Sequence, residues 1–122
     1  MPKGARGEAT FECGGETYTL LYNNRALADA ENRTGKGILA VMDEARERKI
    51  SVRDTADMLV AGLEAARREA RAPHKPFTVE HAYAILDAMG FPAVYQLVME
   101  AILQCFQYEP EGSAEEPNPS SA

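Results

Sequence analysis

The chain has 122 residues, 45% of them hydrophobic, and a formal net charge of −6 at pH 7. This length suits one small domain with a single hydrophobic core. No segment approaches the roughly 20 apolar residues of a membrane-spanning helix, and the first residues lack the apolar run of a signal peptide. We therefore expect a protein that works in the cytoplasm and binds no membrane.

The negative charge is concentrated at the end of the chain. Four carboxylates lie in the last fifteen residues: Glu109, Glu111, Glu115 and Glu116. The one basic cluster, Arg67, Arg68 and Arg71, is offset by Glu64 and Glu69 and predicts a solvated helix face. Because no broad basic surface is predicted, we do not expect nucleic acid as a partner.

Two cysteines, Cys13 and Cys105, are too few for a disulfide framework and lie far apart in the sequence. Both sit in apolar patterns. Because a free cysteine packs like a small hydrophobic side chain, we predict that both are reduced and buried.

After a flexible start over residues 1–6, a β-hairpin is predicted over residues 8–22. Apolar and polar residues alternate on both sides of Gly14 and Gly15. A two-residue glycine turn suits a hairpin because glycine adopts positive φ without strain. The register that places the apolar residues on one face pairs Cys13 with Glu16, Phe11 with Tyr18 and Ala9 with Leu20.

Helices are predicted over residues 24–33, 38–48, 51–72, 78–89 and 92–107. Asn23 or Asn24, Ser51 and Thr78 are suitable N-caps. Glycines after the first and fourth helices, and the prolines of the 73–76 linker, separate the helical segments.

The helix over 51–72 has the clearest amphipathic pattern. Its predicted core stripe consists of Val52, Ala56, Leu59, Val60, Leu63 and Ala66. The side expected to face solvent carries Arg53, Asp57, Glu64, Arg67 and Arg68.

The last helix, over 92–107, is apolar over more than one stripe. We assign its core stripe to Val94, Val98, Ala101, Ile102 and Cys105. Such a helix is either central in its own core or has a second apolar face for a partner, and both interpretations stay open at this point.

These elements predict an α+β, mainly α fold, in which an N-terminal hairpin packs on four to five helices. The domain is expected to span residues 7–107. Residues 108–122 are rich in Glu, Pro and Ser and predict a disordered acidic tail.

No motif of catalysis or ligand binding is found in the sequence. Gly14 and Gly15 lack the G-x-G-x-x-G order, and "NRTGKGI" lacks the residues of a phosphate-binding loop. His74 and His81 match no zinc spacing, and no Ser or Cys stands in a catalytic motif. We therefore predict no enzyme activity, no cofactor and no metal.

Three short motifs point to a family. They are "GG-x-x-Y-x-L" at Gly14, Gly15, Tyr18 and Leu20, "ALA-x-x-E" at Ala26, Leu27, Ala28 and Glu31, and "L-x-x-G-L" at Leu59, Gly62 and Leu63. With the order of elements, they resemble the phage tail assembly chaperones of gene transfer agents and long-tailed phages, a group sometimes labelled tail tube protein. The resemblance covers residues 6–106, whereas "RREARAPHKPF" and the acidic tail depart from the family pattern.

The resemblance implies an assembly factor of the bacterial host cytoplasm that is not retained in the mature virion. Such chaperones coat the helical tape measure protein, keep it soluble and help to recruit tail tube subunits. The tape measure protein is thus the expected partner, with the tail tube protein as a second one. Self-association through the last helix is left open.

On this hypothesis, the contact residues lie on the last helix, outside its core stripe. The candidates are Tyr95, Leu97, Met99 and Leu103. The alternative is a structural tail protein, either a tube or a terminator subunit. Tube subunits are expected to be rich in β-structure, so a single hairpin among helices argues against that alternative.

Overall fold

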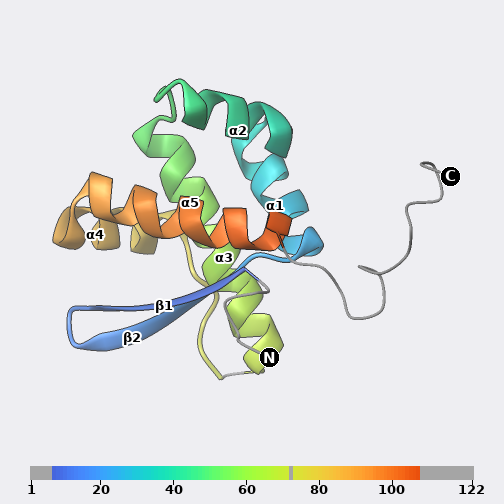
Figure 1. Ribbon diagram of the computed structural model, residues 1–122. Coiled ribbons are helices and arrows are strands. Elements are labelled where there is room, and N and C mark those ends of the chain that lie inside the picture. Colours follow the sequence, from blue (N-terminus) through green and yellow to red (C-terminus); the bar gives the residue numbers. More distant parts are fainter. Residues whose placement is uncertain (1–6, 72, 108–122) are drawn as a thin grey trace, which may run out of the picture.

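The computed structural model describes residues 7–71 and 73–107 (Figure 1). An N-terminal antiparallel hairpin packs on five helices, which confirms the predicted α+β, mainly α class. The strands and helices are β1 (Glu8–Cys13), β2 (Glu16–Leu21), α1 (Asn24–Thr34), α2 (Ile38–Arg46), α3 (Val52–Ala70), α4 (Val79–Met89) and α5 (Phe91–Gln107). The flexible start over 1–6 and the disordered tail over 108–122 were predicted for residues outside the described ones.

The hairpin has the predicted register. Phe11 lies opposite Tyr18, and their rings stack with 5.4 Å between centroids. Gly14 and Gly15 both have positive φ, 61° and 82°, which explains why glycines form the turn. β2 packs on α3, and β1 contacts α4 and α5, so the helices cover one face of the hairpin.

α3 is the central helix and packs against α1, β2, α4 and α5 (Figure 1). As predicted, Ser51 caps it, and the Ser51 hydroxyl accepts a hydrogen bond from the N–H of Asp54 at 2.9 Å. The carboxylate of Asp54 is buried and accepts a hydrogen bond from Lys36 Nζ at 2.7 Å. This bond fastens the loop between α1 and α2 to α3.

Two side chains of α3 differ from the prediction. Val52, assigned to the core stripe, is 46% exposed because it is the first residue of the helix, where the core ends. Glu64, assigned to the solvent side, is only 6% exposed. Neighbours cover most sides of the middle turns of α3, so a one-sided stripe does not describe them.

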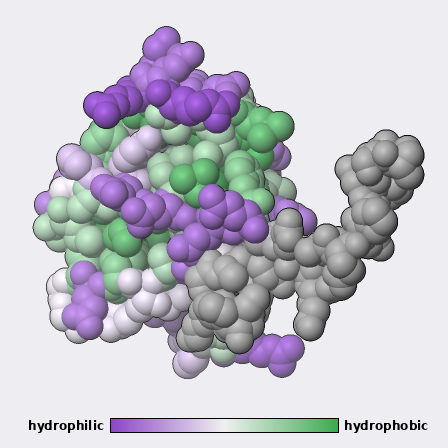
Figure 2. All heavy atoms as spheres, in the orientation of Figure 1, coloured by the Kyte–Doolittle hydropathy of each residue, from purple (hydrophilic) through white to green (hydrophobic). Residues whose placement is uncertain are grey.

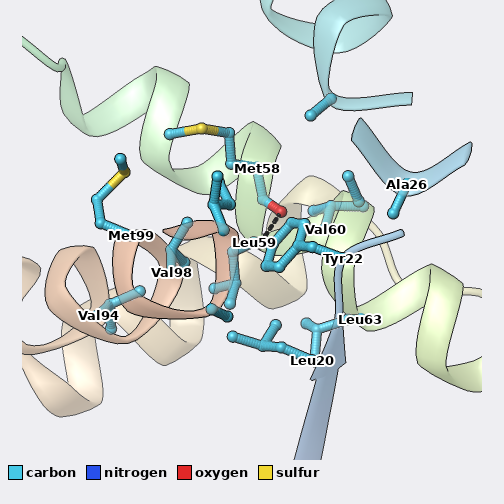
Figure 3. Close-up of a cluster of buried hydrophobic side chains, with 14 of the residues drawn as sticks. Leu20, Tyr22, Ala26, Met58, Leu59, Val60, Leu63, Val94, Val98 and Met99 are labelled. Atoms are coloured by element: carbon cyan, nitrogen blue, oxygen red, sulfur yellow. Dashed lines mark hydrogen bonds between the residues drawn. The ribbon is translucent and has the colours of Figure 1, made fainter. Parts of the chain in front are cut away.

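The centre of the core is a contact between Tyr22 and α3 (Figure 3). Tyr22 is fully buried, and its hydroxyl donates a hydrogen bond to the carbonyl of Met58 at 2.6 Å. This burial raises the pKa of Tyr22 far above its ordinary value. A Cβ atom on Gly62 would lie 2.7 Å from the Tyr22 ring. The glycine of the "L-x-x-G-L" motif therefore makes room for the buried tyrosine.

The last two helices are joined at Gly90 and bend by 117° relative to one another. No single described helix is long and apolar enough to cross a membrane, and α4 and α5 reach that length and composition only as this bent pair.

The end of α5 packs against the start of β1. A Cβ atom on Gly7 would lie 3.0 Å from the Cβ of Cys105, and Gly7 also accepts a hydrogen bond from the N–H of Tyr22. Cys13 and Cys105 are half-buried and packed against the core, rather than fully buried as predicted. Cys13 lies beside the hairpin turn and Cys105 lies in the last turns of α5, so both are at the ends of their elements.

Candidate partner-binding surface

A groove of about 470 Å³ separates the end of α2 from the first turns of α5. Its lining residues, the α2–α5 groove from here on, are Ala45, Arg48, Ile50, Phe91, Pro92, Tyr95 and Gln96. Figure 2 shows hydrophilic residues over the end of α2 and in a band along α5, with apolar surface between them. The groove is thus an apolar hollow between two polar borders.

The α5 wall follows from the sequence at the start of that helix. Pro92 lies in the first turn, where its fixed φ and missing N–H cost nothing. Phe91 and Tyr95 are four residues apart, so they lie on the same side of the helix, with 5.9 Å between their ring centroids. The first turns of α5 therefore present a continuous aromatic surface to the groove.

The opposite wall depends on how α2 ends. Arg48 has a left-handed backbone, with φ of 59°, and its N–H donates to the carbonyl of Ala45 at 3.0 Å. This reversal directs the chain back toward α5, where Ile50 is 8% exposed. Among the described residues that line this groove, Arg48 is the only charged one. The groove thus suits an apolar side chain next to an acidic one.

The four predicted contact residues are not equivalent in the structure. Tyr95 lines the groove and is half-buried, and Leu103 is 42% exposed. Met99 is only 7% exposed and belongs to the buried cluster of Figure 3. Leu97 is half-buried, but a helix turns by about 100° per residue, so it lies on the other flank of α5 from Tyr95.

Several surface residues were missed by the sequence reasoning. Leu39 is 71% exposed and Phe106 is 41% exposed, and Phe91 and Ile50 line the groove. A signal existed for Leu39, because it lies beside Ile38 in a short helix whose single core stripe cannot hold both. The position of Ile50 had no local signal, since it depends on the reversal at Arg48.

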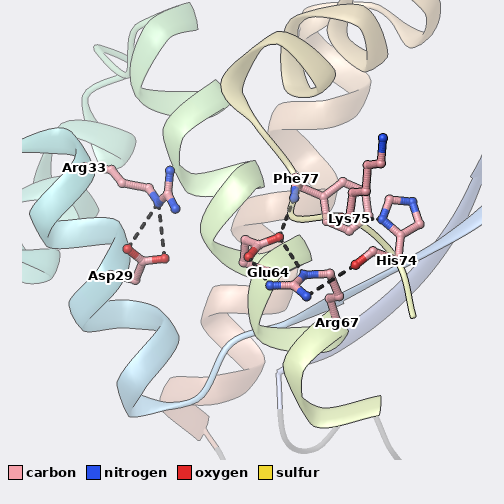
Figure 4. Close-up of polar contacts among 7 residues, drawn as sticks. All are labelled: Asp29, Arg33, Glu64, Arg67, His74, Lys75 and Phe77. Carbon is pink, nitrogen blue, oxygen red and sulfur yellow. Dashed lines mark hydrogen bonds and ion pairs between the residues drawn. The ribbon is translucent and has the colours of Figure 1, made fainter. Parts of the chain in front are cut away.

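A cluster of polar contacts holds the segment over residues 73–77 against α3 (Figure 4). Glu64 accepts two hydrogen bonds from the guanidinium of Arg67, at 2.8 and 3.0 Å, and a third from the N–H of Phe77 at 2.5 Å. Figure 4 also shows His74 beside Phe77, and their rings stack at 4.5 Å. This cluster fastens the linker between α3 and α4.

The charge state of Glu64 follows from these contacts. Burial alone raises the pKa of its carboxyl, but the hydrogen bonds from Arg67 and Phe77 and the charges of Arg67 and Arg68 outweigh it and hold the pKa below its ordinary value. Within residues 7–71 and 73–107, no three His, Cys, Asp or Glu side chains are grouped so that they could hold a metal ion.

The family described as phage tail tube protein, GTA-gp10, matches residues 6–104 of this chain. The match includes the hairpin, the whole of α3 and the groove-lining part of α5. No curated protein and no solved structure matches the chain. Because the family covers most of the sequence, this chain belongs to the phage tail family of the GTA-gp10 type.

Proposed function

We propose that this phage tail protein is a tail assembly chaperone that binds the tape measure protein and keeps it soluble in the host cytoplasm until tail tube subunits arrive. It then leaves, and the mature virion does not contain it. The observation that carries this proposal is the α2–α5 groove, an apolar hollow on a mainly helical protein. The role needs neither an enzyme activity nor a cofactor.

In this mechanism, an amphipathic helix of the tape measure protein lays its apolar face into the groove. Burial of apolar surface contributes about 25 cal/mol per Å². The groove is lined by only seven residues, so we expect a single copy to bind weakly. Many copies along one tape measure chain raise the overall affinity. Arg48 at the border favours an acidic residue beside the apolar face of the bound helix.

The alternative function is a structural tail protein, such as a tube or terminator subunit. The description of the family as tail tube protein favours it. The sheet of the described residues has only two strands, which offers little for ring-to-ring pairing of β-structure. The two functions differ in where the protein is found, because only a structural subunit stays in purified particles.

The test is co-expression with the tape measure protein encoded in the same phage element. We expect soluble tape measure protein that co-elutes with this chain. Tyr95→Glu places a charge in the groove, and Leu103→Glu places one on an exposed apolar residue of α5 about two turns beyond Tyr95. Both substitutions are expected to abolish co-elution. Ala93→Glu is the matched control, because it adds the same charge to an exposed position of the same helix.

If the tape measure protein stays insoluble and this chain elutes alone, the chaperone proposal is wrong. Detection of the chain in purified tails would then support the structural alternative. If co-elution survives Tyr95→Glu, the partner binds outside the groove and the assignment of the groove fails.

A further inference from the structure

The outer edge of β2 carries backbone groups that bond to no other described residue. Opposite residues in an antiparallel pair alternate between pairs that are joined by hydrogen bonds and pairs that are not. The bond from Tyr22 N–H to Gly7 C=O shows that Gly7 and Tyr22 form a bonded pair, so every second pair from there toward the turn is also bonded. The N–H and C=O groups of Thr17 and Thr19 therefore point away from β1. Within residues 7–71 and 73–107, they form no hydrogen bond. Such an edge is a template for another strand.

A pocket of about 170 Å³ lies along this same edge. On the sheet side it is lined by four consecutive residues of β2 and by none of β1, which places it at the outer edge of the hairpin. Its other walls come from α3 and the 73–77 segment: Leu63, Ala66, Arg67, Ala70, His74 and Phe77. The small side chains Ala66 and Ala70 leave the space open.

A strand added at the outer edge of β2 would point every second side chain toward the pocket. Successive side chains of a strand point to opposite faces, and Tyr18 lies on the same face as its partner Phe11, toward the core. A residue of an added strand opposite Tyr18 would point the same way, toward α3. Its side chain would enter the pocket, so backbone pairing and side-chain recognition coincide.

Charge indicates which kind of strand fits. Residues 7–22 contain three glutamates, Glu8, Glu12 and Glu16, and no Lys, Arg or His. A second copy of the hairpin would carry the same net negative charge and would be repelled. The second copy would also bring its own 73–77 segment to this edge, where the 73–77 segment of the first copy already lines the pocket. A basic extended segment from another protein avoids both conflicts.

We propose that the outer edge of β2 binds an extended, basic segment of a partner protein as a third strand, with an apolar side chain of that segment in the pocket beside Tyr18. Backbone hydrogen bonds to Thr17 and Thr19 supply the pairing, and the pocket selects the side chain. This edge is separate from the α2–α5 groove, so it adds a second binding surface to the molecule.

The test uses the full chain, labelled with ¹⁵N, and a synthetic peptide of alternating threonine and valine with a lysine at each end. Hydrogen exchange of single amides is measured with and without the peptide. We expect exchange at Thr17 and Thr19 to slow by roughly tenfold or more on binding. Thr10 and Glu12, on the outer edge of β1, are expected to keep their rates.

Four variants make the test specific. Ala70→Leu fills the pocket from a helical position and is expected to weaken peptide binding roughly tenfold, whereas Ala84→Leu, an exposed alanine of α4, leaves it unchanged. Thr19→Pro removes an outward N–H without breaking a bond to β1 and is expected to weaken binding as well. Tyr95→Glu leaves peptide binding unchanged, which separates this edge from the groove.

The proposal is wrong if Thr17 and Thr19 keep their exchange rates, or if protection arises at the edge of β1 instead. It is also wrong if Ala70→Leu and Ala84→Leu bind the peptide equally well. Protection of Thr17 and Thr19 that grows with the concentration of this chain alone would identify a second copy as the occupant and overturn the choice of partner.

Discussion

α3 and α2 are both amphipathic helices, yet they contribute to the molecule in different ways. α3 is capped by Ser51 and is buried around most of its circumference. α2 begins at Gly37 without a side-chain cap, buries only Val41 and Met42, and exposes Leu39. The core therefore depends far more on α3 than on α2, and α2 leaves apolar surface uncovered. A partner can therefore contact α2 without disturbing the core around α3.

The largest effect on the free energy of unfolding is expected when a methionine is shortened in each of the two helices. Met58 of α3 is 0% exposed and Met42 of α2 is 7% exposed. We expect Met58→Ala to lower the free energy of unfolding by about 4 kcal/mol and Met42→Ala by about 2 kcal/mol, because the peripheral helix can collapse onto the cavity. Urea denaturation measures both, and equal losses would contradict the division of roles.

A second comparison uses glycines. In Gly62→Ala the new Cβ lies 2.7 Å from the ring of Tyr22, whose hydrogen bond to Met58 holds it in place. We expect a net loss of about 2 kcal/mol despite the better helix propensity of alanine. In Gly37→Ala, at the start of α2, the new Cβ meets only Glu31 Oε2, at an ordinary contact distance of 3.9 Å, and the change is expected to cost less than about 0.5 kcal/mol. Thermal unfolding of both variants checks this difference.

The third prediction concerns how the stability of the fold changes at acidic pH. The pKa of Glu64 is lower in the folded chain than its ordinary value of 4.5. Its contribution to stability is therefore fully present above that value and is lost as the pH falls through the folded pKa. We expect Glu64→Gln to cost about 1.5 kcal/mol at neutral pH and to flatten the loss of stability on acidification.

The matched control for Glu64→Gln is Asp87→Asn, at an exposed carboxylate of α4. Denaturation midpoints at a series of acidic pH values compare the two variants with the unchanged chain. If both variants follow the same acid profile as the unchanged chain, the cluster around Glu64 does not control acid stability.

The smallest effect concerns the two arginines with left-handed backbones, Arg48 after α2 and Arg71 after α3. Arg48→Gly and Arg71→Gly remove the strain of a side chain in that conformation, and we expect each to stabilise the fold by about 0.5–1 kcal/mol. Only Arg48→Gly is expected to weaken tape measure binding, because only Arg48 lines the groove. Equal binding by the two variants would remove Arg48 from the binding surface.

Features set by neighbouring residues were predictable. The two-glycine turn fixed the hairpin register, and Ser51 marked the start of the central helix. Tyr95 was singled out because it lies outside the core stripe of its helix, and it does line the groove.

Features set by distant residues were not predictable. The burial of Glu64 depends on Phe77, whose N–H donates a hydrogen bond to it from the linker between α3 and α4. The floor of the groove depends on Ile50, which reaches α5 only because the chain reverses at Arg48. A periodic pattern shows which face of a helix is apolar, but not which segment comes to lie against it.

The contact between Gly7 and Cys105 has a consequence for synthesis on the ribosome. Among the described elements, the start of the hairpin emerges first, and α5, the helix that covers it, emerges after all the others. The hairpin therefore waits through the synthesis of nearly the whole domain before its final neighbour is present, and during that time its apolar face lacks part of its cover. The fold of residues 7–107 is complete only after α5 has emerged, and a chain that stops before α5 leaves the beginning of β1 unprotected.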